Sequence, residues 1–214
     1  WEVDVDGWAR DGRVEFCLVS DNRPAVEPYF LETGGVYPSQ LPEEARLALQ
    51  RLTSDVLNAF PGFHGCFHFE ARLDLSSLAV MPIELNARVG GAECPAAVEA
   101  VTGHWLPAVA ARLALGLPAP EAPAQSRFGV VASTNIHVFE HGTVAECSAE
   151  SLDVAGNNVI MSMLFGTVGQ RHAPNLGSAS CLAILAAGGA SADEAEACLE
   201  SAKSQLRISI AAEP

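Results

Sequence analysis

Apolar residues alternate with other residues in the first part of the chain. Val14, Phe16 and Leu18 recur at every second position, which is the period of a β-strand. The dipeptide Asp11-Gly12 interrupts the alternation, and Asp-Gly favours the two-residue type I′ turn. The pattern over residues 1–20 therefore predicts an antiparallel hairpin.

A predicted loop and then a segment with helical spacing follow the alternating residues. Residues 21–41 are rich in Pro and Gly and are expected to form a long ordered loop of the kind that often serves a site. From Pro42 to Phe60 apolar residues recur at spacings of three and four, and Glu43 and Glu44 lie in the first turn. This arrangement predicts an amphipathic helix.

The remaining patterns predict a series of strands and helices around one candidate boundary. Leu117–Ser126 contains three prolines and is the best place for a division between domains. Before it, the expected elements are strands at 64–74 and 79–86, a break at Gly90-Gly91, and helices at 96–101 and 104–115. After it, they are strands at 128–138, 143–147, 159–165, 181–187 and 206–210, and a helix at 192–205.

These elements predict an α+β fold. Residues 1–118 are expected to form an antiparallel sheet with packed helices. Residues 127–214 are expected to form a smaller, mixed α/β, lid-like subdomain. We find no internal repeat.

Composition narrows the classes of partner. The chain has 214 residues, 49% of them hydrophobic, and a formal charge of −14. This acidity argues against nucleic acid and anionic membranes as partners, because both attract basic surfaces. The apolar stretch Trp105–Leu117 is broken by Arg112 and is too short to span a bilayer. Small molecules and metal cations are the expected partners and the cytoplasm the expected location, while a homo-oligomer remains an open alternative.

The six cysteines do not form a recognisable metal or redox motif. They are spread along the chain, and no two of them form a C-x-x-C pair. We expect them to be buried or incidental thiols.

The candidate functional residues are concentrated on the strands predicted at 64–74 and 79–86. Glu84, Asn86 and Arg88 are two residues apart and would project from the same side of the strand and its end. Glu70, on the neighbouring strand, can lie opposite them. Carboxylate and amide oxygens suit Mg²⁺ or Mn²⁺, and Arg88 suits a phosphoryl group. The alternative is an exposed strand that carries alternating polar residues.

The segments His68–Glu70 and Ile83–Gly91 together resemble the metal-binding hairpin of the ATP-grasp carboxylate–amine ligases. That hairpin reads H-x-E, then a short turn, then I-E-x-N-x-R-x-G-G. The opening segment Glu2–Gly7 is similar to the family's E-x-S/D-V-D-G strand. Tyr29–Gly34, with Pro38-Ser39 after it, is similar to the family's F-x-E-x-G…P-S loop. The resemblance covers residues 1–116 and is nearest to L-amino-acid and dipeptide ligases.

The resemblance implies a role for each of these residues. Glu70 and Glu84 would bind Mg²⁺ with Asn86 as a further ligand, and Arg88 would stabilise the γ-phosphoryl group of ATP and the acyl phosphate. Gly90 and Gly91 would let backbone approach the substrate. Apart from the resemblance, the place of Glu32 in the predicted loop makes it a candidate for contact with a substrate amine. ATP would phosphorylate a carboxylate, and an amine would then displace the phosphate.

Several alternatives stay open. A biotin-carboxylase-like or purine-pathway ATP-grasp enzyme would share the metal hairpin, and so would a catalytically silent module. The family's upstream lysines and glycine-rich loop, which hold the nucleotide, have no counterpart in this sequence, so we expect them to precede it. Glu2, Asp4 and Asp6 form either an acidic row facing the site or a solvated face, and His68 is either structural or catalytic.

Overall fold

The protein was studied as a computed structural model, which describes residues 1–121, 125–149 and 158–212. The chain forms two compact units. The first consists of residues 1–22 and 36–128, and the second of residues 23–35 and 129–214. Each unit is described by itself below.

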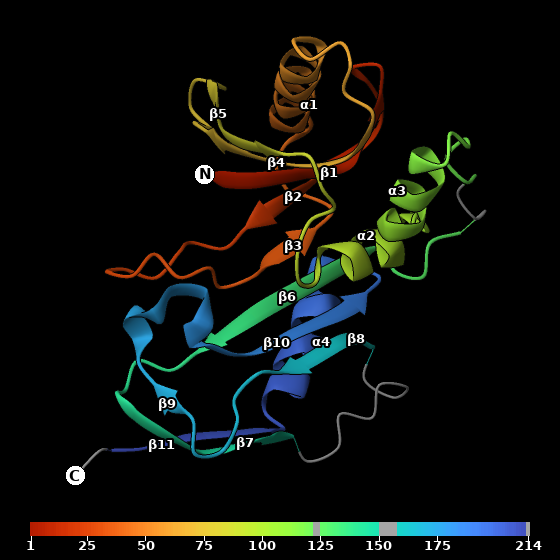
Figure 1. Ribbon diagram of the computed structural model, residues 1–214. Coiled ribbons are helices and arrows are strands. Elements are labelled where there is room, and N and C mark those ends of the chain that lie inside the picture. The colour runs from red at the N-terminus through yellow and green to blue at the C-terminus, as the bar shows by residue number, and fades with distance from the viewer. Residues whose placement is uncertain (122–124, 150–157, 213–214) are drawn as a thin grey trace. The chain divides into compact units, whose positions relative to one another are not determined.

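The first unit is built on four antiparallel strands (Figure 1). The predicted hairpin is confirmed, because β1 (Glu2–Arg10) pairs with β2 (Arg13–Asn22). Asp11 and Gly12 have φ values of 51° and 77°, and a type I′ turn requires a positive φ at both positions. β4 (Gly65–Leu73) pairs with β1 on one side and with β5 (Val80–Asn86) on the other. The order β5-β4-β1-β2 therefore leaves β5 at an edge.

Side chains alternate along the central strands β1 and β4, so they pack into two different apolar clusters. Phe67 and Phe69 of β4 are buried against helix α1 (Glu43–Asn58), together with Val3 and Val5 of β1. Cys66 belongs to a separate apolar cluster on helix α3 (Leu106–Ala114). Because successive side chains of a strand point to opposite faces, Cys66, His68 and Glu70 lie on the face away from α1.

Helix α2 (Cys94–Thr102) begins shortly after β5. Pro95 lies in its first turn, where the missing N–H removes no helical hydrogen bond. Gly103 ends it with a φ of 77°, in the left-handed region that favours glycine. Both helices predicted between the Gly90-Gly91 break and the proline-rich segment are therefore confirmed, and α2 starts two residues earlier than the sequence pattern indicates.

The described residues of the second unit form two antiparallel arrays of strands and one long helix. The first array has the order β6-β10-β8, and α4 (Ala192–Lys203) contacts its three strands. The Ser191 side chain caps α4 by accepting a hydrogen bond from the backbone N–H of Glu194. The strands of the unit are β6 (Val130–His137), β7 (Gly142–Ala149), β8 (Val159–Leu164), β9 (Arg171–His172), β10 (Cys181–Gly189) and β11 (Leu206–Ala211). The second array has the order β11-β7-β9, and the α+β class is confirmed.

Some short elements were not predicted from the sequence. These are β3 (Gly35–Tyr37), β9 and the 3₁₀ segment Pro174–Ser180. The segment predicted as one long loop is accordingly shorter, because β2 continues to Asn22 and β3 begins at Gly35. Residues 23–35 belong to the second unit, where Arg23 Nη2 lies 2.6 Å from Glu196 Oε1 and Arg23 Nε donates to the Ser133 carbonyl.

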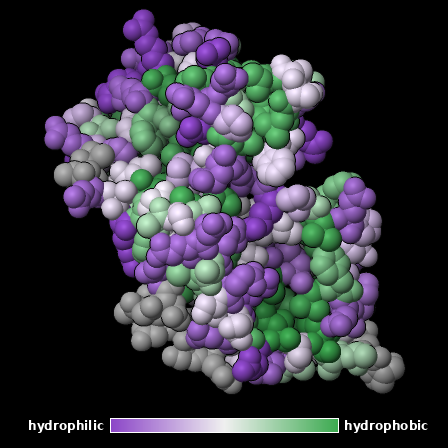
Figure 2. Space-filling view, turned by 180° about the vertical axis from the view of Figure 1, so that it is seen from behind, coloured by the Kyte–Doolittle hydropathy of each residue, from purple (hydrophilic) through white to green (hydrophobic). Residues whose placement is uncertain are grey.

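Apolar side chains also reach the surface. Figure 2 shows apolar patches between stretches of hydrophilic surface on one face of the molecule. Met163, Leu164 and Phe165 are each at least 40% exposed, although scattered apolar exposure is common in proteins. Among the described residues, no helix combines the length and apolar character needed to cross a membrane.

Candidate active site

The β4–β5 hairpin places the predicted metal-binding residues opposite one another. Glu70 pairs with Glu84 across the two strands, and His68 pairs with Asn86. The Asn86 side chain donates a hydrogen bond of 2.6 Å to Glu84 Oε1. This hydrogen bond, followed by one with Glu70, lowers the pKa of Glu84 below its ordinary value. The two carboxylates therefore lie together as predicted, whereas Asn86 presents its side-chain nitrogen to Glu84 and not the predicted oxygen.

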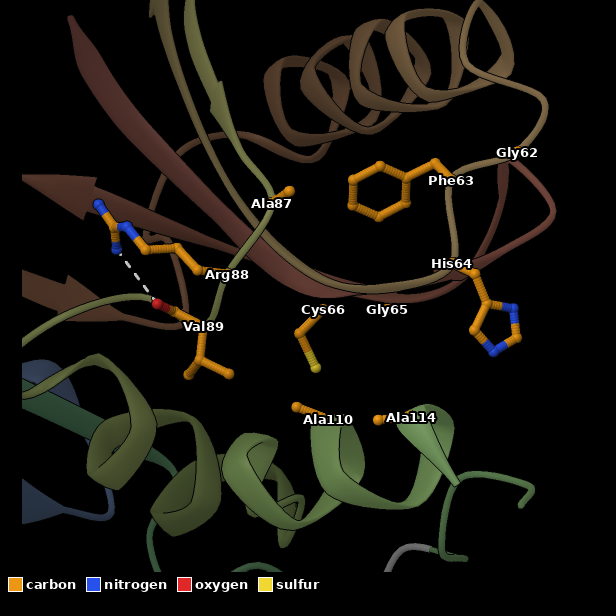
Figure 3. Close-up of a pocket in the computed structure, with 10 residues that line it drawn as sticks. All are labelled: Gly62, Phe63, His64, Gly65, Cys66, Ala87, Arg88, Val89, Ala110 and Ala114. Atoms are coloured by element: carbon orange, nitrogen blue, oxygen red, sulfur yellow. Dashed lines mark hydrogen bonds between the residues drawn. The ribbon is translucent and has the colours of Figure 1, made fainter. Parts of the chain in front are cut away.

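Arg88 lies two residues after the end of β5 and is exposed. Its Nη1 donates to the Val89 carbonyl at 3.1 Å, and its charge contributes to the lowered pKa of Glu84. Arg88 also borders a cavity of about 430 Å³ with Phe63, His64 and Cys66. Figure 3 shows the guanidinium extending to the side opposite Phe63 and His64. The cation is thus near Glu84 and is held by one backbone hydrogen bond.

Of the acidic row of β1, Asp4 and Asp6 are buried on the same sheet face, whereas Glu2 is partly exposed and pairs with Arg72. Asp4 and Asp6 are 8% and 1% exposed. His68 Nδ1 lies 3.0 Å from Asp6 Oδ1, and His68 Nε2 lies 3.4 Å from Glu70 Oε1. Asn22 donates a hydrogen bond of 2.8 Å to Asp4. His68 therefore connects the buried Asp6 to Glu70 of the β4–β5 hairpin.

Burial and charge act in opposite directions on these groups. Burial raises the pKa of Asp4 to about 7, although the charge of His68 opposes this. For His68, burial lowers the pKa, but the hydrogen bond to Asp6 and the charges of Asp6, Asp4 and Glu70 outweigh it and raise the pKa to about 9. A protonated His68 consequently compensates part of the negative charge buried here.

The segment after β5 closes over this buried row. Cys94, at the start of α2, is buried, and its Sγ lies 3.1 Å from the Tyr37 hydroxyl. A Cβ added at Gly90 would lie 2.5 Å from Asp6 Oδ1 and 2.9 Å from Cys94 Cβ. Only a residue without a side chain fits at position 90, because a Cβ at these distances would overlap atoms that are themselves buried.

Solved structures share this fold along nearly the whole chain. Phosphoribosylglycinamide synthetase from Anaerococcus prevotii matches 99% of the chain and 53% of its own, with a TM-score of 0.83 and 13% identity. L-amino acid ligase from Bacillus licheniformis matches 98% of the chain and 52% of its own, with a TM-score of 0.83 and 23% identity. No family model matches the sequence.

One curated relative agrees in sequence as well. Carnosine synthase 1 from Gallus gallus is 34% identical over 203 residues, which are 92% of this chain and 20% of that protein. This chain belongs to the ATP-grasp carboxylate–amine ligase superfamily. It spans about a fifth of the length of the curated relative, 20%, and about half of the two solved structures, 53% and 52%.

Within this ATP-grasp chain the remaining candidate residues differ in their surroundings. A Cβ at Gly91 would meet no atom within 4 Å, so only Gly90 is held closely by its neighbours. Glu32 is exposed and lies in the second unit, where its carbonyl accepts a hydrogen bond of 2.8 Å from His137 Nε2. The substrate roles of Glu32, Gly90 and Gly91 stay predictions.

The sequence left open whether Asp4 and Asp6 face the site, and it did not reveal that Cys94 lies beside them. For the two aspartates a signal existed, because each alternates with a valine that points into the apolar core. For Cys94 there was none, since its place beside Asp6 depends on the path of the segment between β5 and α2.

Proposed function

We propose that the full-length protein is an ATP- and Mg²⁺-dependent ligase that joins a carboxylate to an amine through an acyl phosphate. The observation that carries this proposal is the pairing of Glu70 with Glu84, beside Asn86 and Arg88, in an ATP-grasp chain. The protein would be ADP-forming, since the γ-phosphoryl group is the one transferred.

The donor atoms at the hairpin suit Mg²⁺, and Mn²⁺ by the same chemistry. Two carboxylates directly opposite one another repel unless a proton or a cation lies between them. Glu84 is exposed and Glu70 is partly exposed, so a hydrated ion with phosphate ligands can reach both. Mg²⁺ prefers oxygen ligands and commonly combines one or two carboxylates with substrate phosphates. Glu70, Glu84 and the Asn86 carbonyl oxygen would hold the ion, which would neutralise phosphate charge when bound.

The chain's own residues would mainly position the reactants. In the first step a carboxylate oxygen of the substrate forms a bond to the γ-phosphorus as the bond to ADP breaks. In the second, the amine nitrogen bonds to the acyl carbon, phosphate leaves and the nitrogen loses a proton. Arg88 would neutralise the phosphoryl oxygens in both steps, and Glu32 would accept a hydrogen bond from the substrate amine.

Amino acids are the substrates that we propose first. The curated relative is named carnosine synthase 1, and one solved structure with this fold is an L-amino acid ligase. The fold itself does not decide among substrates, because a phosphoribosylglycinamide synthetase shares it to the same TM-score of 0.83. The choice of substrate therefore rests on the sequence relative.

The test is release of ADP and phosphate by the full-length protein with Mg-ATP and pooled amino acids. We expect release that depends on the amine and falls by at least about 10²-fold in Glu84→Gln and Arg88→Ala. Glu99→Gln, an exposed glutamate on α2, is the matched control and should keep the activity. ATP binding without turnover on amino acids or bicarbonate would instead indicate a silent module.

A further inference from the structure

Three different donor atoms meet inside the first unit, beside the carboxylate pair. They are a carboxylate oxygen of Asp6 on β1, a ring nitrogen of His68 on β4 and the thiol sulfur of Cys94 at the start of α2. All three atoms lie within 4.8 Å of one another, and all three residues are buried. A tetrahedral Zn²⁺ site has metal–ligand distances of about 2.0–2.3 Å, so only small shifts would bring these atoms to one ion.

Asp6 provides independent support for a ligand at this place. Its side chain is 1% exposed, and its Oδ2 has no hydrogen-bond partner among the described residues. Its other oxygen, Oδ1, lies 3.0 Å from His68 Nδ1. A buried carboxylate oxygen without a partner is costly, and a cation among the three residues would remove that cost.

The second nitrogen of His68 has the environment that a metal-bound histidine usually has. A histidine that binds a metal through one ring nitrogen normally donates its other N–H to a carboxylate or a carbonyl. His68 Nε2 lies 3.4 Å from Glu70 Oε1 and 3.9 Å from Asp4 Oδ2. Nδ1 is then the nitrogen that faces Asp6 and the proposed ion.

We propose that Asp6, His68 and Cys94 supply three of the ligands of a buried Zn²⁺ site. The Tyr37 hydroxyl, 3.1 Å from Cys94 Sγ, would donate a hydrogen bond to the zinc-bound thiolate. Mixed nitrogen, oxygen and sulfur ligands suit Zn²⁺, whereas the all-oxygen set of the hairpin suits Mg²⁺. The site would bind zinc whether or not the protein is a ligase.

The proposed ion would join three elements that are far apart in the sequence. It would hold β1, β4 and the start of α2 together, and Gly90 lies against all three of its ligand residues. Without the metal, the pKa of the Cys94 thiol is raised well above its ordinary value, and burial is the largest cause. Zinc would bind the thiolate, so binding would release a proton.

The experiment uses full-length protein that has been stripped of metal and then dialysed against Zn²⁺ or Co²⁺. We expect one Zn²⁺ per chain from this site by elemental analysis, and a thiolate-to-cobalt charge-transfer absorption with Co²⁺. Cys94→Ala and Asp6→Asn should each weaken zinc binding by at least about 10²-fold, since loss of an outer partner alone often costs 10–100-fold.

Cys66→Ala is the matched control, because Cys66 and Cys94 are equally well buried, 5% and 7% exposed. Cys66→Ala and the hairpin variant Glu84→Gln should both keep the zinc and the cobalt absorption. Zinc binding that survives Cys94→Ala, or a cobalt form of the unaltered protein without thiolate absorption, would overturn the proposal. The cobalt spectrum needs no variant, so a misfolded Cys94→Ala protein does not prevent the test.

Discussion

Two groups of polar residues share one face of the first unit's sheet and have opposite environments. The hairpin group (Glu70, Glu84, Asn86, Arg88) includes residues of the edge strand β5 and is largely open to solvent. The buried group (Asp4, Asp6, His68, Cys94) comes from the central strands and the start of α2, and every member is less than 10% exposed. Position in the sheet, rather than residue type, separates them.

The difference determines what each group requires. An exposed carboxylate is stabilised by water and is available to a hydrated ion and its phosphates. A buried carboxylate has lost that solvation and must have a partner inside the protein. Asp6 has His68 on one oxygen only. The hairpin group is therefore suited to binding and releasing ligands from solvent. The buried group is suited to stabilising the fold.

The largest effect on the free energy of unfolding is expected from Asp6→Ala. It would leave His68 buried beside Asp4 without its hydrogen-bond partner, and breaking a buried charged pair costs about 3–5 kcal/mol. Hydrogen exchange of the β1 and β4 amides in the full-length protein measures this locally. Asp55→Ala, an exposed aspartate on α1, is the control, and an equal loss in both variants would contradict the distinction between the groups.

Gly90→Ala should have the next largest effect, about 1–3 kcal/mol, from overpacking. The added Cβ would lie 2.5 Å from Asp6 Oδ1 and 3.1 Å from His68 Nδ1. Gly91→Ala is the neighbouring control and should change the unfolding free energy by less than about 0.5 kcal/mol, because no atom lies within 4 Å of its Cβ. The same exchange measurement compares the two, and equal protection in both would mean that the segment is not held against the buried group.

A smaller effect is expected from pH in protein stripped of metal. The pKa of His68 is raised from 6.5 to about 9, so its stabilisation is complete below pH 6.5 and is lost as pH rises through 9. The pKa of Asp4, raised from 3.8 to about 7, acts in the same direction, because the folded state favours its protonated form. We therefore expect stability to decrease between pH 6.5 and 9.

Thermal unfolding across that pH range measures the decrease. His68→Gln removes the titrating ring and should flatten the pH profile, whereas His64→Gln, outside the buried group, should leave it unchanged. If the stability of His68→Gln still falls steeply with pH, other groups cause the pH dependence.

Glu84→Gln should have the smallest effect on stability, within about 0.5 kcal/mol, since surface substitutions outside special features rarely exceed this. Glu84 is exposed and lies on an edge strand. The same variant is expected to abolish ligation, so it separates stability from activity. A large loss of exchange protection in β5 would show instead that the hairpin group also maintains the fold.

Much of the first unit was predictable because its patterns are local. The hairpin at Asp11-Gly12, helix α1 and the facing strands β4 and β5 follow from alternation, helical spacing and turn residues. The pairing of Glu70 with Glu84 was expected for the same reason, since a short turn brings the two strands together. The two-residue strand β9 was missed because two residues carry no periodicity.

The sequence by itself determined the longer helices and strands, the polar face of the hairpin and the resemblance to ATP-grasp ligases. Only the tertiary structure decided that Asp4 and Asp6 are buried, that His68 contacts Asp6 across 62 positions of sequence, and that Cys94 lies beside them. The same holds for residues 23–35, which join the second unit. Periodicity tells which side of a strand a residue occupies, but what covers that side depends on contacts between distant segments.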